Sequence, residues 1–140
     1  MDTYLHPSLN NRLVYIEFCF LSFIITTFRL VMLSGFTNFK AAFNSLCAYA
    51  SVNHLHWHLY YMSPQFQLPI ETCSGKRLSG DCYEIDKYSA KGFVFQVKTV
   101  EDIDRTAKCI FSIVRLLCDM NIAHNLFVSR GTNLDIANQR

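Results

Sequence analysis

Three histidines alternate with apolar residues in the segment 54–59 (HLHWHL). Side chains two residues apart in a β-strand point to the same face of the sheet, and successive side chains point to opposite faces. In a strand, the three imidazoles would share one face, while the two leucines and the tryptophan would line the other face against a core. The aromatic-rich stretch Asn53–Met62 is therefore predicted to be a strand that is buried on one side.

Other segments predict a sheet of mixed strand lengths. Four have the composition of strands, namely Phe39–Leu46, the short Gln67–Glu71, Lys91–Lys98 and Ile122–Arg130. The stretch Thr72–Ala90 carries glycines and scattered charges, and it is predicted to be a loop. Together with two helical segments, this order predicts an α+β fold with a mostly antiparallel sheet and flanking helices.

Two segments are predicted to be helical. The apolar run Leu13–Ser34 is expected to be helical in its second half and to end at Gly35, because glycine often follows a helix. The second helix begins near Thr99, which has the capping-box spacing to Asp102, and ends at Asn121. Its apolar residues recur at helical spacing and fall on one face; they are Ile103, Ala107, Ile110, Val114 and Leu117.

The composition is that of a globular domain without a nucleic-acid footprint. The chain has 140 residues, of which 51% are hydrophobic and 17% charged, so it has enough apolar material for a packed core. The net charge is +2, and the basic residues form no cluster larger than the pair Lys76-Arg77. Nucleic acid is therefore not expected as a partner.

The apolar run Leu13–Leu33 is long enough to span a bilayer. Glu17 and Arg29 interrupt it, however, and each would cost about 2.5–3.5 kcal/mol in mid-membrane. A signal peptide fits poorly, because only Arg12 precedes the run closely and no small-residue cleavage site follows it. We expect a buried or interface element, with a membrane anchor as the alternative.

None of the six cysteines forms a Cys-x-x-Cys pair. A disulfide framework is typical of small, loop-rich secreted chains, which this chain does not resemble. We therefore expect mostly reduced, buried or half-buried thiols in a cytoplasmic protein.

Three imidazoles on one face support two kinds of chemistry. Neighbouring histidines on a strand can bind zinc, with a further ligand from elsewhere. A neutral imidazole can instead attack a phosphorus centre and form a phosphoramidate. His56 would be that nucleophile, because it has a histidine on either side. Three ordinary polar residues on a solvated face are the remaining interpretation, and the pattern alone leaves zinc binding and nucleophilic catalysis open.

The residues around the histidines resemble the signature of the GDP-D-glucose phosphorylases. The resemblance begins with residues 43–62 (FNSLCAYASVNHLHWHLYYM) and returns far downstream at residues 121–131 (NIAHNLFVSRG). Two short stretches between them, LPIE at 68–71 and GFVF at 92–95, fit in the same order. The similarity covers roughly Leu30 to Thr132.

This resemblance implies a histidine-triad fold, similar to that of the galactose-1-phosphate uridylyltransferases, and a phosphorolytic activity. Family members cleave GDP-D-glucose with inorganic phosphate to give GDP and glucose 1-phosphate, through GMP held on the middle histidine. Carried to this chain, His56 is the nucleophile, and His54 orients its ring through a hydrogen bond. His58 contacts phosphate oxygens or assists the leaving group.

The resemblance also supplies candidate substrate contacts. Ser51 would contact phosphate, and Asn44 would reach the phosphates or the ribose. His124 and Asn125 are secondary candidates. No cofactor and no metal are expected, and the expected partners are GDP-D-glucose and inorganic phosphate.

The domain division follows from the extent of the resemblance. Residues 1–29 are an unaligned apolar region, residues 30–132 a partial histidine-triad-like catalytic domain, and residues 133–140 a polar tail. The fold is therefore expected to be incomplete. An inactive truncated fragment and a histidine-triad hydrolase of other nucleotides are the alternative functions.

Overall fold

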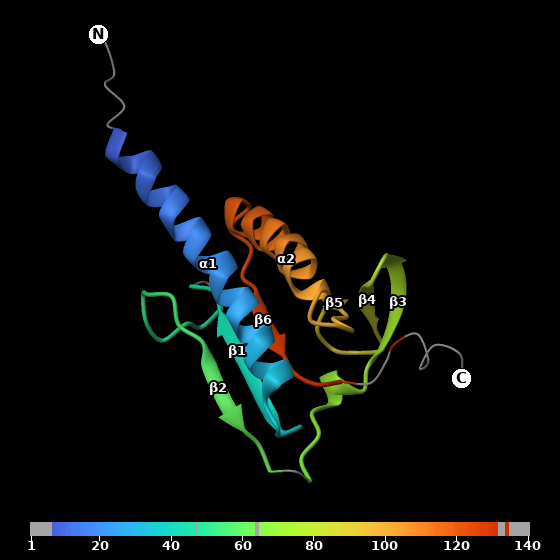
Figure 1. The fold of residues 1–140 in the computed structure, drawn as a ribbon. Coiled ribbons are helices and arrows are strands. Elements are labelled where there is room, and N and C mark those ends of the chain that lie inside the picture. Colours follow the sequence, from blue (N-terminus) through green and yellow to red (C-terminus); the bar gives the residue numbers. More distant parts are fainter. Residues whose placement is uncertain (1–6, 47, 64, 132–133, 135–140) are drawn as a thin grey trace.

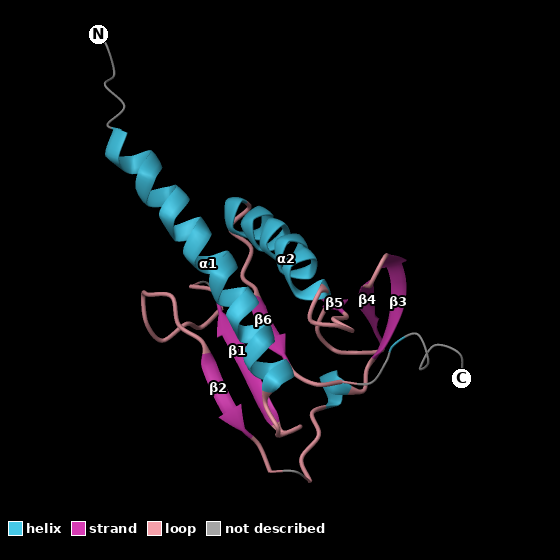
Figure 2. Cartoon of the chain, in the orientation of Figure 1, coloured by secondary structure: helices cyan, strands magenta, loops and turns pink. Residues whose placement is uncertain are grey.

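The computed structural model describes residues 7–46, 48–63, 65–131 and 134, with the side chains of the first helix described from Cys19 onward. In this part of the chain, two helices accompany two antiparallel sheets of three strands each (Figures 1 and 2). The elements are α1 (Pro7–Leu33), β1 (Phe39–Asn44), β2 (His58–Tyr61), the 3-10 turn η1 (Pro69–Glu71), β3 (Ser74–Ser79), β4 (Cys82–Asp86), β5 (Phe93–Phe95), α2 (Asp102–Asp119) and β6 (Asn125–Val128). The predicted α+β class with antiparallel strands is confirmed.

The first sheet has the order β2-β1-β6. In its register, Ala42 of β1 lies opposite His58 of β2 and opposite Phe127 of β6. Asn44, at the end of β1, lies opposite Asn125, at the start of β6. The sheet therefore joins segments that lie far apart in the sequence, and it places the histidine segment and the downstream HNL stretch at the same end.

Both helices cover one face of this sheet (Figure 1). The buried residues of α1 and α2 form one cluster of Phe20, Ile24, Phe28, Ile103, Ala107, Ile110 and Val114. Sheet residues pack against it from β1, β2's lead-in and β6, among them Phe43, Trp57, Leu126 and Val128. The predicted apolar face of α2 is confirmed, except that Leu117 is only half-buried.

The two ends of α2 are fixed by local hydrogen bonds. The main-chain N–H and the hydroxyl of Thr99 each donate to Asp102 Oδ2 at 3.2 Å. At the other end, Asn121 adopts a positive φ of 54°. Its N–H donates to the Cys118 carbonyl at 3.0 Å, and Ile122 N–H donates to Leu117 at 2.8 Å, which is the Schellman pattern of a helix stop.

The first helix is longer than its apolar pattern predicts, because it begins at Pro7. Its last carbonyls receive an unpredicted partner from the far end of the chain. The Arg130 guanidinium donates to the carbonyls of Val31 at 3.3 Å and Met32 at 2.9 Å, and also to that of Ser34. Since terminal helical carbonyls lack intrahelical donors, Arg130 ties the end of α1 to the strand that follows α2.

The expected loop at Thr72–Ala90 is wrong. This stretch forms the hairpin β3–β4, which pairs with β5. Gly80 turns the hairpin with a φ of +54°, and Tyr83 of β4 is fully buried. Glycine is required at position 75 of β3, because a Cβ there would lie 2.9 Å from the Cβ of Tyr83. The predicted strand Gln67–Glu71 is also wrong, since Pro69–Glu71 forms a 3-10 turn.

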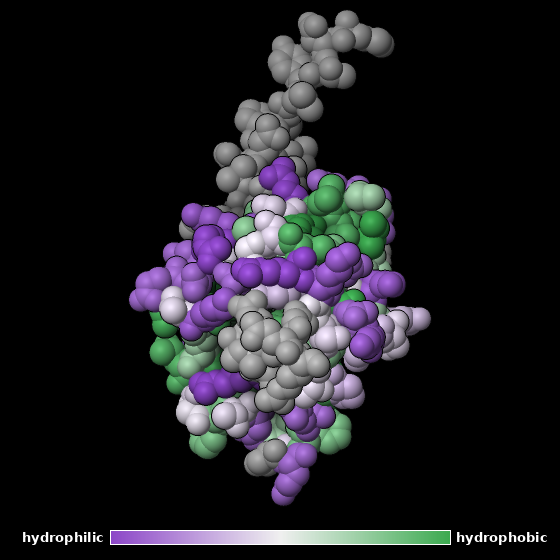
Figure 3. Space-filling model, turned by 90° about the vertical axis from the view of Figure 1, so that its right-hand side faces the viewer, coloured by the Kyte–Doolittle hydropathy of each residue, from purple (hydrophilic) through white to green (hydrophobic). Residues whose placement is uncertain are grey.

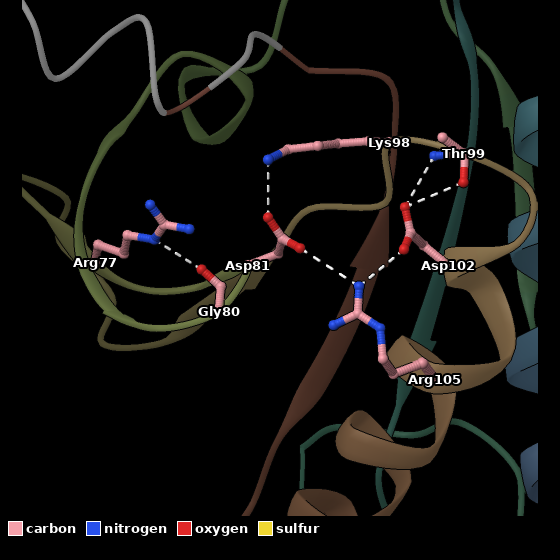
Figure 4. A network of polar contacts seen from close by, with 7 residues as sticks. All are labelled: Arg77, Gly80, Asp81, Lys98, Thr99, Asp102 and Arg105. Carbon is pink, nitrogen blue, oxygen red and sulfur yellow. Dashed lines mark hydrogen bonds and ion pairs between the residues drawn. The ribbon is translucent and has the colours of Figure 1, made fainter.

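Charged side chains join the hairpin to the start of α2 (Figure 4). Asp81, in the hairpin turn, accepts from Lys98 at 2.9 Å and from Arg105 at 3.5 Å, and Arg105 also contacts Asp102 at 2.8 Å. The hydrogen bond from Lys98 is the main reason that the pKa of Asp81 lies below its usual value. Hydrophilic residues cover much of this side of the molecule (Figure 3).

The structure bears on the expectations about a membrane anchor and about the cysteines. Among the described residues, none of the helices combines the length and apolar character that crossing a membrane requires. Cys19, Cys73 and Cys82 are half-buried free thiols, and burial raises the pKa of Cys73 and Cys82. Cys109 and Cys118 are exposed, so the expectation of buried or half-buried side chains is wrong for these two. Cys47 lies outside the described residues.

Candidate active site

The histidine segment enters the sheet later than its alternation predicts. Of the three histidines, only His58 belongs to β2, while His54 lies in a bend and His56 lies outside any helix or strand. The strand prediction for residues 53–57 is therefore wrong. The chain turns directly after β1, where Ala48 N–H donates to the Ser45 carbonyl at 2.9 Å, so no neighbouring strand pairs with the residues before His58.

The three imidazoles nevertheless lie side by side. The ring centroids of His54 and His56 are 5.3 Å apart, and those of His56 and His58 are 4.7 Å apart. Leu55 and Trp57 point to the core on the other side, and the Trp57 ring lies 5.5 Å from that of Phe43. The alternation thus predicts the sides of the rings correctly, although Leu59, at the sheet edge, is 50% exposed.

The hydrogen bonds of His56 define its neutral tautomer. Its Nδ1 lies 3.2 Å from the main-chain carbonyl of His54, and a carbonyl can only accept, so Nδ1 carries the proton. The Nε2 atom therefore holds the lone pair. It faces Nε2 of His58 at 3.0 Å, which must then be the donor. The hydrogen bond that His54 makes to the His56 ring comes from its main-chain carbonyl.

Asn44 and Ser51 lie near the loop that carries the histidines. The side-chain amide of Asn44 donates to the Ala48 carbonyl at 3.3 Å, which fixes it at the end of β1. Ser51 is exposed, in the bend that precedes the triad. The two residues therefore flank the triad segment from β1 and from the loop.

His124 extends the β1–β6 pairing by one residue. Its N–H donates to the Ser45 hydroxyl at 3.0 Å, and Ser45 N–H donates to its carbonyl at the same distance. The ring Nδ1 donates to the Ile122 carbonyl at 2.9 Å. The ring Nε2 is buried and has no hydrogen-bond partner among the described residues. Alternation along the strand places this ring on the helix-covered side, away from the side chain of Asn125.

The other face of the sheet carries the polar residues, and neither α1 nor α2 packs on it. We call it the open face; its residues are Lys40, Ala42, Asn44, His58, Tyr60, Asn125 and Phe127. Most of them are half-buried or exposed, as expected for a surface that can receive a ligand. The open face therefore carries His58, Asn44 and Asn125, and the His56 ring lies beside that of His58.

A buried ion pair, which sequence reasoning missed, lies at the far end of the open face. Lys40 of β1 donates to Glu71 of η1, and the two side chains are 5% and 2% exposed. Burial raises the pKa of Glu71, but hydrogen bonds from Lys40, from the Leu68 N–H and from Ser129 outweigh it, so the net pKa lies below the usual value. Glu71 belongs to the LPIE stretch, so the pair anchors this stretch to β1.

Two other features lie apart from the histidines. A groove of 530 Å³ at the end of α1 is lined mostly by apolar residues such as Leu30, Leu33 and Tyr61, and no histidine of the triad contributes to it. Among the described residues, no group of three or more histidine, cysteine or acidic side chains is arranged to hold a metal ion.

Comparison with known proteins identifies two family models along the chain. Residues 2–60 match the GDPGP1-like N-terminal domain, and residues 64–139 match the GDPGP1-like C-terminal domain. The first range contains α1, β1, the triad and most of β2, and the second contains the elements from η1 to β6. The sheet β2-β1-β6 therefore combines strands from both matched ranges.

Several curated proteins are similar to the chain over most of its length. GDP-D-glucose phosphorylase 1 of Danio rerio is 40% identical over 108 residues, which are 76% of this chain and 30% of the relative. The Homo sapiens protein of the same name is 38% identical over 72% of the chain and 26% of the relative. GDP-L-galactose phosphorylase 2 of Arabidopsis thaliana is 31% identical over 65% of the chain and 21% of the relative. The chain thus spans less than a third of these relatives, and no solved structure matches it.

Proposed function

We propose that this chain, which belongs to the GDPGP1-like family, carries the catalytic histidines of a GDP-D-glucose phosphorylase. The reaction is the conversion of GDP-D-glucose and inorganic phosphate to GDP and glucose 1-phosphate, which makes the protein a nucleotidyltransferase. The observation that carries the proposal is the His56 geometry: its Nδ1 is held by a carbonyl, and its Nε2 lone pair is on the side of the neighbouring rings.

In the first step, Nε2 of His56 attacks the α-phosphorus of GDP-D-glucose. A nitrogen–phosphorus bond forms, the bond from the α-phosphorus to the bridging oxygen breaks, and glucose 1-phosphate leaves. The His54 carbonyl stabilises the positive charge that develops on the ring, because it accepts the Nδ1 proton. This contact also keeps Nε2 unprotonated for the attack.

His58 assists the same step from the other side. In the resting protein its Nε2–H occupies the lone pair of His56 at 3.0 Å. When substrate arrives, this N–H is freed and can donate to an oxygen of the phosphoryl group or to the leaving oxygen. Ser51 and Asn44, beside the triad segment, are assigned to phosphate or ribose contacts.

In the second step, inorganic phosphate attacks the same phosphorus. An oxygen–phosphorus bond forms, the bond to His56 breaks, and GDP is released. The two displacements replace one difficult transfer with two easier ones. No cofactor is needed for this sequence. Residues 30–132 would form the partial catalytic domain, and a cytoplasmic location fits a nucleotide-sugar substrate.

The products formed with and without phosphate test the proposal. Purified protein incubated with GDP-D-glucose and phosphate is expected to give equal amounts of GDP and glucose 1-phosphate. Both products can be measured by ³¹P NMR. Without phosphate, release of glucose 1-phosphate should stop after a single turnover. Continuous release of GMP without phosphate would instead identify a hydrolase and reject the proposed function.

The hexose is tested in the same assay. The Arabidopsis relative is named for GDP-L-galactose, so this sugar nucleotide is the second candidate substrate. The proposal predicts a higher kcat/KM for GDP-D-glucose than for GDP-L-galactose. The reverse order would assign the chain to the other activity.

A further inference from the structure

Asn125 occupies a position that its own strand does not explain. It is the first residue of β6, it is exposed, and its carboxamide makes no hydrogen bond within the described residues. Asparagine is depleted in strands, because its side chain adds little packing on a pleated surface. In contrast, Asn44, directly opposite, uses its amide to hold the loop at Ala48. Asn125 therefore has donors and an acceptor available to a ligand.

The sheet register places Asn125 on the same face as the nucleophile. Leu126 and Val128 pack into the core, so the residues between and before them face the other way. On the β2 side, His58 lies opposite Ala42, and the His56 ring lies beside that of His58. Only the methyl group of Ala42 projects from β1 between His58 and Phe127. The centre of the open face therefore carries only a small side chain, which leaves room for a ligand.

The separation across this face suits a diphosphate. Neighbouring strands lie about 4.8 Å apart, so β2 and β6 are separated by roughly 10 Å across β1. An attacking nitrogen stands about 3–3.5 Å from the phosphorus before the bond forms. The phosphorus would then lie above β1, and a second phosphoryl group in line with it would extend toward β6. Asn125 is the polar side chain of β6 that faces this position.

We propose that the Asn125 carboxamide binds the phosphoryl group that lies in line with His56. This inference rests on the proposed function. In the first displacement, this group is the phosphate of the departing glucose 1-phosphate. In the second, it is inorganic phosphate, because in-line attack must come from the side opposite the His56 nitrogen. One residue would therefore serve both the leaving and the attacking phosphate without taking part in bond formation.

Two variants test the assignment, and one of them, Asn125→Asp, matches asparagine in size. Asn125→Ala removes the carboxamide, and Asn125→Asp keeps its shape but adds a negative charge. We expect Asn125→Ala to raise the KM for inorganic phosphate roughly tenfold, since one hydrogen bond to a charged group is lost. Asn125→Asp should raise it further by repulsion. Both variants should still form the covalent adduct on His56, more slowly than the parent protein.

The same measurements can overturn the inference. An unchanged KM for phosphate in both variants would reject it. A loss in Asn125→Ala that Asn125→Asp restores would place a neutral hexose at this position. Ser112→Ala, on the exposed side of α2, is the control. Titration of the parent protein with inorganic phosphate should shift the NMR signals of the Asn125 side-chain NH₂, and their failure to move would also reject the inference, independently of how the variants fold. Absence of phosphorolysis in the parent protein would instead reject the proposed function.

Discussion

The Nε2 atoms of His56 and His58 lie 3.0 Å apart, and the first must accept the hydrogen bond that the second donates. This assignment follows from the carbonyl at Nδ1 of His56, which leaves no proton for its Nε2 in the neutral ring. The two neighbouring histidines are therefore expected to hold opposite tautomers.

Histidine tautomers can be measured directly. Long-range ¹H–¹⁵N NMR spectra of the neutral protein should show a protonated Nδ1 on His56 and a protonated Nε2 on His58. A protonated Nε2 on His56 would contradict the assignment. The His54→Ala variant, which retains the main-chain carbonyl, should leave the tautomer of His56 as it is.

The same geometry ranks the three histidines by their effect on rate. His56→Ala should abolish turnover, because the covalent step is lost. His58→Ala removes a proton donor, and we expect a loss of about 10²–10⁴-fold in kcat. His54→Ala should cost roughly tenfold or less, since the carbonyl that orients His56 belongs to the main chain. A loss in His54→Ala as large as that in His56→Ala would contradict this ranking.

The buried pair of Lys40 and Glu71 predicts a large effect on stability. Glu71→Gln leaves the Lys40 charge without its partner, and we expect a loss of about 3–5 kcal/mol in unfolding free energy, measured with urea. The double variant Lys40→Met with Glu71→Met removes both charges. It should be more stable than the single variant Glu71→Gln, and the reverse order would contradict the account.

The stabilisation by Glu71 should also depend on pH. Its pKa in the folded protein lies below the ordinary value of 4.5, so folding favours the charged form. The contribution is present above pH 4.5 and is lost as the pH falls through the lower, folded pKa. The stability difference between the parent protein and Glu71→Gln should therefore narrow on acidification, and a constant difference would reject this assignment.

The hydrogen bonds of Arg130 link the end of α1 to the segment that follows β6. Replacing it with Gln removes the charged donors to the last carbonyls of α1. We expect a loss of roughly 1–2 kcal/mol, because solvent replaces part of these hydrogen bonds. Hydrogen exchange should rise in the last turn of α1. Arg130→Lys keeps the charge without the planar fork, so it should recover only part of the loss.

The contacts of Asp81 with Lys98 and Arg105 are expected to hold the β3–β4 hairpin against the start of α2. Asp81→Asn weakens the contacts with Lys98 and Arg105, so hydrogen exchange should increase in the hairpin. The effect should shrink at high salt, since the Lys98 and Arg105 side chains are 43% and 59% exposed. Asp86→Asn is the matched control, because the carboxylate of Asp86 contacts the N–H of the adjacent Lys87. Equal effects of the two variants would contradict the docking role.

Sequence patterns predicted those secondary-structure elements that are determined by residues close together in the chain. The spacing from Ile103 to Val114 predicts the buried face of α2, and Thr99 and Asp102 mark its start. The β3–β4 hairpin lacks such a pattern, because most of its side chains are exposed on both faces. Its position depends on Asp81, whose partners lie in other elements, and a sequence pattern does not contain these contacts.

The candidate site shows the same division. Alternation correctly predicts that the three imidazoles lie side by side, with Leu55 and Trp57 packed against the core. It does not predict where pairing begins, since this depends on where β1 ends. The contacts of Arg130 with α1 and of Lys40 with Glu71 join residues far apart in the chain, so they required the fold itself.

The covalent state of His56 after a brief reaction tests the account most directly. Protein quenched within one turnover of GDP-D-glucose, in the absence of phosphate, should carry GMP on the peptide that contains His56, as mapped by mass spectrometry. Addition of phosphate before quenching should remove the label and release GDP. A label on another residue, or phosphorolysis without any label, would contradict the central claim.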